Sequence, residues 1–172
     1  HSKNKWSHQD MKPKWWNKSR SYLIKKDKVI SKLIKSYKGH LTTRNNFFYS
    51  LTRSIISQQI SVAAADSVFS KFEKKCKNKI NPKTVQKLSI QDLKKCGLSK
   101  MKAIGIKSLA QKILDKSFNP KLIKKMTDEE AIIYLSSLRQ IGRWSAEMVL
   151  IFFYNRPNIW PVQDIGLLRA IS

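Results

Sequence analysis

Helix-start signals recur along this 172-residue sequence, whereas the strict apolar–polar alternation of strands is nearly absent. Most of the apolar runs with helical spacing are preceded by a residue whose side chain can accept a hydrogen bond from the first helical turn. These candidate caps are Asn45 or Asn46, Ser61, Asn81, Asn119 and Thr127. Proline follows directly after Asn81 and Asn119, at the position where a helix tolerates it best. The sequence therefore predicts an all-α fold with about eight to ten short helices.

These signals divide the chain into a tail and one helical domain. Residues 1–14 are polar and lysine-rich, and we expect a flexible basic arm there. Residues 15–172 are expected to form the domain, which opens with an amphipathic helical stretch from about Trp15 to Tyr37. Gly39 is a suitable C-cap for that stretch.

The charge of the chain is strongly positive and unevenly distributed. Lys and Arg total 35 against 11 acidic residues, a formal charge of +24. Residues 71–125 carry 17 basic and 3 acidic residues, whereas residues 126–172 carry 4 and 5 and contain no lysine. Such a surplus favours a polyanionic partner, either nucleic acid or an anionic membrane surface. An AT-rich genome also favours Lys, Ile and Asn, so compositional drift is a competing source of part of the surplus.

Several classes of protein are excluded or disfavoured by the sequence. The two cysteines, Cys76 and Cys96, are too few for a disulfide scaffold, a four-thiolate zinc site or a cysteine-ligated iron–sulfur cluster. The three histidines have no metal-ligand spacing, so we expect no metal site. The longest apolar run, Met148 to Tyr154, is too short to span a bilayer, and we expect no membrane partner. Without a signal sequence, a reducing intracellular compartment is the expected location.

One segment combines a helix, a tight turn with glycine and a second helix. It contains L-R-Q-I-G-R-W-S-A at Leu138–Ala146 and predicts a helix–hairpin–helix over about 128–154. The start of the second helix exposes backbone N–H groups at a positive dipole end. Gly142 would allow a phosphate to approach this turn closely, so the hairpin could bind DNA without a charged side chain. An ordinary corner between two helices is the alternative.

Four blocks together resemble the endonuclease III superfamily of DNA glycosylases, and within it the alkylation-repair branch of the DNA-3-methyladenine glycosylase II type. The blocks are Ser54–Ala65, Gly97–Ile104, the hairpin, and P-V-Q-D at 161–164. The resemblance implies a two-lobed all-α fold with the base pocket between the lobes. It also implies a monomer that binds double-stranded DNA in the bacterial nucleoid or the eukaryotic nucleus. There it would flip out and excise alkylated purines, leaving an abasic site.

In this family the aspartate of the loop at 160–166 is the catalytic carboxylate, and that position is Asp164. Breaking an N-glycosidic bond builds positive charge on the sugar, which a neighbouring carboxylate stabilises. The same group can orient or deprotonate the attacking water. The alternative is that Asp164 merely caps a helix that begins at Ile165.

The resemblance also assigns a pocket for the base. Bifunctional relatives carry a nucleophilic lysine at the position of Trp144, so this chain is expected to use water and to lack lyase activity. An indole face attracts a cationic methylated base through a cation–π contact. Met148, one helical turn later, and Trp160 are the other candidate pocket residues. Packing in the core is the alternative role of Trp144.

Two further groups of residues are expected to contact DNA. Gln59 occupies the position that fills the gap left by the flipped base, with Gln58 beside it. The alternative is a pair of solvated polar residues at a helix junction. The candidate phosphate-binding residues of the hairpin are Gln140, Gly142, Arg143 and Ser145. Lys100 or Lys102 could add a phosphate contact, although isolated basic residues are usually only solvated.

The sequence departs from the family pattern in the hairpin and at its end. Gln140 replaces the first glycine of the turn, which would cost about 1 kcal/mol if that position needs a positive φ. Relatives continue beyond the catalytic loop with helices that complete the first lobe. This chain stops at Ser172, so we expect those C-terminal helices to be absent, either from a fragment or from the protein. We expect no cofactor, while a monovalent cation at the hairpin stays open.

Two other functions remain open at this point. The chain could be a non-catalytic or fragmentary helix–hairpin–helix module that binds DNA, or a glycosylase for a different damaged base. The charge alone also permits a role at a membrane surface, but no basic helix with a bulky apolar face demands it.

Salt dependence separates a functional lysine surplus from a compositional one. If about six lysines neutralise DNA phosphates, the slope of log affinity against log salt should be near −5. Titration of a labelled duplex at several salt concentrations measures this slope. A slope near zero would mean that the surplus does not serve DNA binding.

Overall fold

The computed structural model describes residues 13, 15–26, 28–36 and 46–161, and within these ranges it contains helices and no strand. The all-α prediction is confirmed. The elements are α1 (Trp16–Lys26), α2 (Lys28–Ser36), α3 (Phe47–Ser57), α4 (Val62–Lys75), α5 (Pro82–Gln86), α6 (Ile90–Lys95), α7 (Lys100–Leu114), the 3₁₀ helix η1 (Pro120–Lys125), α8 (Asp128–Ser136) and α9 (Arg143–Phe152).

The predicted N-caps hold the starts of most helices. Asn46, Ser61, Asn81, Asn119 and Thr127 each accept a hydrogen bond from a backbone N–H of the first turn that follows. Ser89 and Ser99 do the same for α6 and α7. At the start of α8 the Glu130 carboxylate also accepts from the Thr127 N–H, which completes a capping box. Local chemistry therefore determines where these helices begin.

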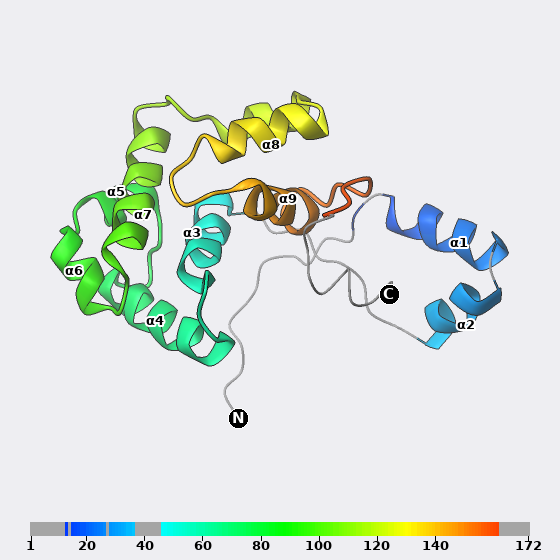
Figure 1. The fold of residues 1–172 in the computed structure, drawn as a ribbon, viewed down its shortest axis with the longest axis horizontal. Helices are drawn as coiled ribbons and strands as arrows, with labels where there is room; N and C mark the ends of the chain where they lie inside the picture. The colour runs from blue at the N-terminus through cyan, green and yellow to red at the C-terminus, as the bar shows by residue number, and fades with distance from the viewer. Residues whose placement is uncertain (1–12, 14, 27, 37–45, 162–172) are drawn as a thin grey trace.

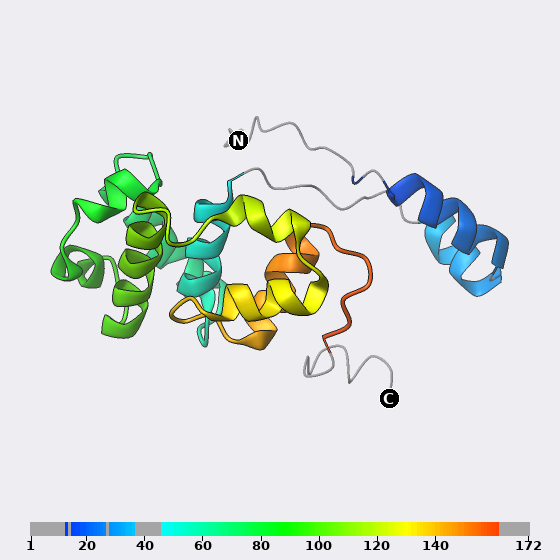
Figure 2. The ribbon, with the colours of Figure 1, turned by 90° about the horizontal axis from the view of Figure 1, so that it is seen from above.

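The amphipathic stretch expected from Trp15 to Tyr37 is two helices instead of one. In both views α1 and α2 lie side by side as a pair away from the other helices (Figures 1 and 2). Arg20 joins them by donating from Nη2 to the Ile34 carbonyl at 2.7 Å. None of the residues of α1 is fully buried. The predicted cap Gly39 and the arm at 1–14, apart from Pro13, lie outside the described residues.

The core is built around α3. In Figure 2, α3 lies between the group formed by α4 to α7 and the pair formed by α8 and α9. Its apolar face is buried against both, and one continuous cluster results. The largest side chains that are almost fully buried include Leu51, Ile55 and Ile56 of α3, Phe72 of α4, Ile106 and Leu109 of α7, Leu135 of α8 and Leu150 of α9. This arrangement fixes the C-terminal end of α3 relative to α7 and to the turn between α8 and α9.

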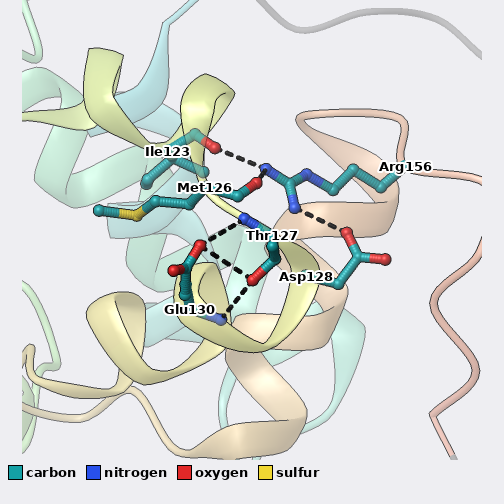
Figure 3. Close-up of polar contacts among 6 residues, drawn as sticks. All are labelled: Ile123, Met126, Thr127, Asp128, Glu130 and Arg156. Atoms are coloured by element: carbon teal, nitrogen blue, oxygen red, sulfur yellow. Dashed lines mark hydrogen bonds and ion pairs between the residues drawn. The ribbon is translucent and has the colours of Figure 1, made fainter.

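Arg156 links the chain after α9 to η1 and to the start of α8. Its guanidinium donates to the Asp128 carboxylate at 2.6 Å and to the carbonyls of Ile123 and Met126 at 2.5 and 2.9 Å. Figure 3 shows these contacts beside the Thr127–Glu130 capping box. The start of the segment that leads to the predicted catalytic loop is therefore held in place.

Both cysteines are buried and free, and burial raises the pKa of the Cys76 thiol to about 11. These thiols are therefore protonated at neutral pH and poorly reactive. No helix among the described residues is long and apolar enough to cross a membrane.

An ion pair between α4 and α6 makes stability depend on pH. The Lys75 ammonium lies 2.9 Å from the Asp92 carboxylate, and the Ser89 hydroxyl donates to the same carboxylate at 2.8 Å. Lys75 first, and then Ser89, hold the pKa of Asp92 well below its usual range. A carboxylate with a depressed pKa stabilises the fold above its unfolded-state pKa and loses this contribution as the pH falls.

We therefore expect Asp92→Asn to lower the free energy of unfolding at pH 7 and to have little effect in strong acid. Urea unfolding of both proteins between neutral pH and the lowest pH at which they stay folded measures the difference. Lys75→Met is the control, because it removes the ammonium and leaves the Ser89 cap. An Asp92→Asn effect that does not change with pH would contradict this account.

Candidate nucleic-acid interface

The turn between α8 and α9 leaves a helix start without a side-chain cap. Gly142 is the N-cap of α9, and no side-chain hydrogen bond is made there. Each element from α3 to α8, η1 included, has such a bond, so α9 differs from all of them. A Cβ placed on Gly142 would meet no atom within 4 Å. The helix start therefore faces open space and can accept an anion.

Gln140 has the left-handed backbone conformation that the sequence analysis considered for this position. Its φ is +66°, so glutamine stands where an L-residue is strained. Gly105 of α7 lies directly behind it, because a Cβ on Gly105 would be 2.7 Å from Gln140 Cγ. A small residue on α7 thus makes room for the larger side chain in the turn.

The other hairpin candidates differ in what they can offer a phosphate. Arg143 is held by two carboxylates: Glu129, at 2.7 and 2.8 Å, and Glu147, at 3.2 Å. Glu129, followed by Glu147, raises the pKa of Arg143. Three of its five guanidinium N–H donors are thus engaged by carboxylates, which also offset the charge that Arg143 could offer a phosphate. Ser145 is buried, so its side chain is not exposed to a phosphate.

The candidate gap-filling residues lie beside this hairpin. Gln58 and Gln59 follow α3 directly, and Gln59 is exposed with a φ of +58°. The Gln58 side chain donates from Nε2 to the Gln140 carbonyl oxygen at 2.6 Å. Two segments 82 residues apart in the sequence thus meet through one hydrogen bond.

Lys102 contacts backbone carbonyls of the protein, whereas the sequence suggested a contact with a DNA phosphate. Its Nζ donates to the carbonyls of Ile56 and Gln58 at 2.8 and 2.6 Å, and burial lowers its pKa. Lys100, in the first turn of α7, is exposed and stays a candidate for a phosphate contact.

A cavity of about 260 Å³ opens between α3 and α9. Its α3 side is polar, with three serine hydroxyls and one guanidinium, whereas its α9 side is apolar. The lining residues are Ser50, Arg53, Ser54, Ser57, Met148, Val149, Phe152 and Phe153. The Arg53 guanidinium lies 2.6 Å from Asp66 and 4.8 Å from the centre of the Phe69 ring.

Of the predicted pocket residues, Met148 lines this cavity and the two tryptophans do not. Trp144, one turn before Met148 on α9, is 43% exposed, so the alternative of core packing does not describe it. Trp160 is 61% exposed. Asp164 lies outside the described residues, as does the predicted catalytic loop beyond Pro161.

Sequence reasoning missed the α3 wall of the cavity. Ser50, Ser54 and Ser57 recur at helical spacing on a helix whose other side is the apolar core. This second, polar face of α3 was a readable signal for a lined site. The partners of Arg53, by contrast, come from α4 and have no signal in the local sequence.

The described residues contain no group of three or more His, Cys, Asp or Glu side chains that could hold a metal ion. The monovalent cation considered for the hairpin stays a prediction.

The family of the chain follows from comparison with known proteins. A sequence model of the HhH-GPD superfamily of base excision DNA repair proteins matches residues 52–172, which include the second half of α3, the helices from α4 to α9 and the hairpin. The chain belongs to this superfamily. The predicted resemblance to helix–hairpin–helix DNA glycosylases is thereby confirmed.

Two relatives come from Schizosaccharomyces pombe. The alkylbase DNA glycosidase-like protein mag2 is 35% identical over 68% of this chain and 57% of its own length. DNA-3-methyladenine glycosylase 1 is 28% identical over 81% of this chain and 63% of its own length. The chain thus spans about six tenths of these curated relatives.

Solved structures have the same fold. The DNA-3-methyladenine glycosidase of Bacillus halodurans has a TM-score of 0.75 and 26% identity, covering 87% of this chain and 70% of its own. The S. pombe glycosylase Mag1 in complex with abasic DNA has a TM-score of 0.68 and 27% identity, covering 87% of this chain and 76% of its own. The predicted endonuclease III-like fold is therefore confirmed.

The strained turn gives a stability prediction. Gln140→Gly should raise the free energy of unfolding by about 1 kcal/mol, because glycine adopts a positive φ without the strain of a Cβ. Gln140→Ala is the matched control, since it keeps the Cβ and loses only the rest of the side chain. Urea unfolding of the three proteins measures both effects. Equal stability of the glycine and alanine variants would refute strain at this position.

Proposed function

We propose that this chain acts as a monofunctional DNA glycosylase that excises alkylated purines of the 3-methyladenine type and leaves an abasic site. Membership of the base excision repair superfamily supports the reaction class. Relatives whose names specify alkylated bases support the substrate class. The observation that carries the proposal is the open helix start at Gly142 beside the Gln58–Gln59 turn, with a lined cavity one helical turn away from Trp144.

The hairpin would bind the DNA backbone through its main chain. The uncapped start of α9 offers N–H groups and a positive dipole end to a phosphate. The exposed Gln59, beside this turn, would enter the duplex and contact the base left without its partner. The phosphate contact is independent of base sequence, as a repair enzyme requires.

The cavity between α3 and α9 would receive the flipped base. Met148 and Phe152 supply an apolar and aromatic wall, and the serine hydroxyls of α3 supply hydrogen-bonding groups opposite. Trp144, which is exposed one turn before Met148 on α9, would add a cation–π contact to a methylated ring. An alkylated base is already a good leaving group, so a site of this kind needs to supply only modest further activation.

Asp164 would stabilise the positive charge that develops on the sugar and orient the attacking water. Trp144 stands where bifunctional relatives have lysine, so no amine is available there for a covalent intermediate. The products are then the free base and an abasic site in an unbroken strand. The DNA partner, the monomeric state and a nucleoid or nuclear location belong to the same proposal.

Base release from a duplex with one alkylated purine tests the proposed reaction. We expect strand breaks only after hot alkali, because alkali cleaves at the abasic site that the enzyme leaves intact. Breaks without alkali would overturn the water-based mechanism. Duplexes with uracil or 8-oxoguanine are the controls for substrate class, and equal rates on all of them would remove the basis for alkylated purines.

Asp164→Asn separates catalysis from binding. We expect the rate of base release to fall about a hundredfold or more, while the affinity for DNA is kept, because an amide cannot supply the charge. Single-turnover base release and duplex titration measure the two quantities. If neither protein releases base and both bind equally, the chain is a DNA-binding module without catalysis.

A further inference from the structure

The N-terminal half of α7 contacts both turns of the candidate interface. Lys102 reaches the end of α3, where its Nζ donates to the carbonyls of Ile56 and Gln58 at 2.8 and 2.6 Å. The last carbonyls of a helix lack partners within the helix, so a charged donor there satisfies two of them at once. Lys102 therefore closes the end of α3 immediately before Gln59.

Gly105, about one turn further along α7, contacts the other turn. Its Cα lies so close to Gln140 that a Cβ would be 2.7 Å from Gln140 Cγ and 3.3 Å from its Cβ. The Gln58 side chain then links the two turns directly through its 2.6 Å hydrogen bond to the Gln140 carbonyl. Three segments thus form a closed set of contacts: α7, the end of α3 and the hairpin turn.

Both turns contain a strained residue within this set. Gln59 has a φ of +58° and Gln140 a φ of +66°. An L-residue in this region costs about 1–2 kcal/mol and persists where its surroundings hold it there. Around Gln59 the holding contacts are those of its neighbour Gln58, whose carbonyl accepts from Lys102 and whose side chain donates to Gln140. The exposed Gln59 side chain makes none of them.

We propose that Lys102 is the positioning residue for Gln59. Its ammonium group fixes the end of α3, so that Gln59 is already oriented to enter DNA before DNA binds. This inference rests on the gap-filling role that the proposed function gives to Gln59. In this role Lys102 contacts the Gln58 carbonyl within the protein and does not bind a DNA phosphate.

The same helix provides a matched control. Lys107, five residues after Lys102 on α7, also donates to two carbonyls at a helix end, those of Gln86 and Leu88 at 2.9 and 2.5 Å. These carbonyls belong to the end of α5, which forms neither turn. Lys107→Met therefore removes the same charge and the same kind of cap without touching Gln58.

The experiment compares the full chain with its Lys102→Met, Lys107→Met and Lys102→Arg variants. The probes are a duplex with one stable tetrahydrofuran abasic site and the same duplex without it. Fluorescence anisotropy at one salt concentration gives the Kd for each, and their ratio reports gap filling. Urea unfolding of every variant reports the loss of stability on its own.

We expect Lys102→Met to lower the ratio of the two Kd values, the preference for the abasic duplex, about tenfold. A loss of this size corresponds to the hydrogen bonds of one misplaced glutamine. Lys107→Met should keep the wild-type ratio even though its stability falls by a similar amount. Lys102→Arg should keep most of the ratio, because a guanidinium can also donate to two carbonyls.

Three results would overturn the proposal: an unchanged ratio in Lys102→Met, an equal loss in Lys107→Met, or a wild type with no preference for the abasic duplex. Amide hydrogen exchange of the free proteins adds a readout without DNA. Exchange at residues 58–60 and 140–142 should accelerate in Lys102→Met and stay unchanged in Lys107→Met. Base release by the wild type is scored separately, so failure of the proposed reaction remains distinguishable from failure of this one.

Discussion

The contacts that α7 makes with the ends of α3, α5 and α8 fix how these helices are placed relative to one another. Three lysines of α7 lie five residues apart, and five residues turn a helix by about 140°. They therefore point in three directions. Lys102 reaches the end of α3, Lys107 the end of α5, and Lys112 the Ser137 carbonyl after α8, at 3.5 Å. Each ammonium group meets the negative end of a helix dipole, so charge and hydrogen bonding act together.

This arrangement changes how the large positive charge is understood. Some of the basic side chains, such as Lys102, Lys107 and Arg156, donate hydrogen bonds to backbone carbonyls of this chain instead of facing a partner. Other lysines remain on the surface, including Lys77, Lys79, Lys83 and Lys87, which line a hollow of about 360 Å³. Composition alone cannot separate these two uses, because a lysine that caps a helix and a lysine that faces solvent look identical in a sequence.

The starts of the helices were predictable, and long-range contacts were not. Asn46, Ser61 and Thr127 act on N–H groups three residues away, so the local sequence contains the whole interaction. The division of the first amphipathic stretch into α1 and α2 has only one local signal, Asp27, which stands directly before α2 and is a residue type favoured at N-caps. The candidate site follows the same rule. Its motif positions were readable, whereas the bond between Gln58 and Gln140 depends on packing across 82 residues.

The uncapped start of α9 has a consequence for how the affinity for DNA would be shared between charged and uncharged contacts. A contact made by backbone N–H groups carries no net charge and releases few counterions, so rising ionic strength weakens it little. Contacts made by surface lysines fade under the same conditions. The affinity that survives in concentrated salt would therefore come from uncharged contacts, those of the hairpin backbone and of Gln59 among them.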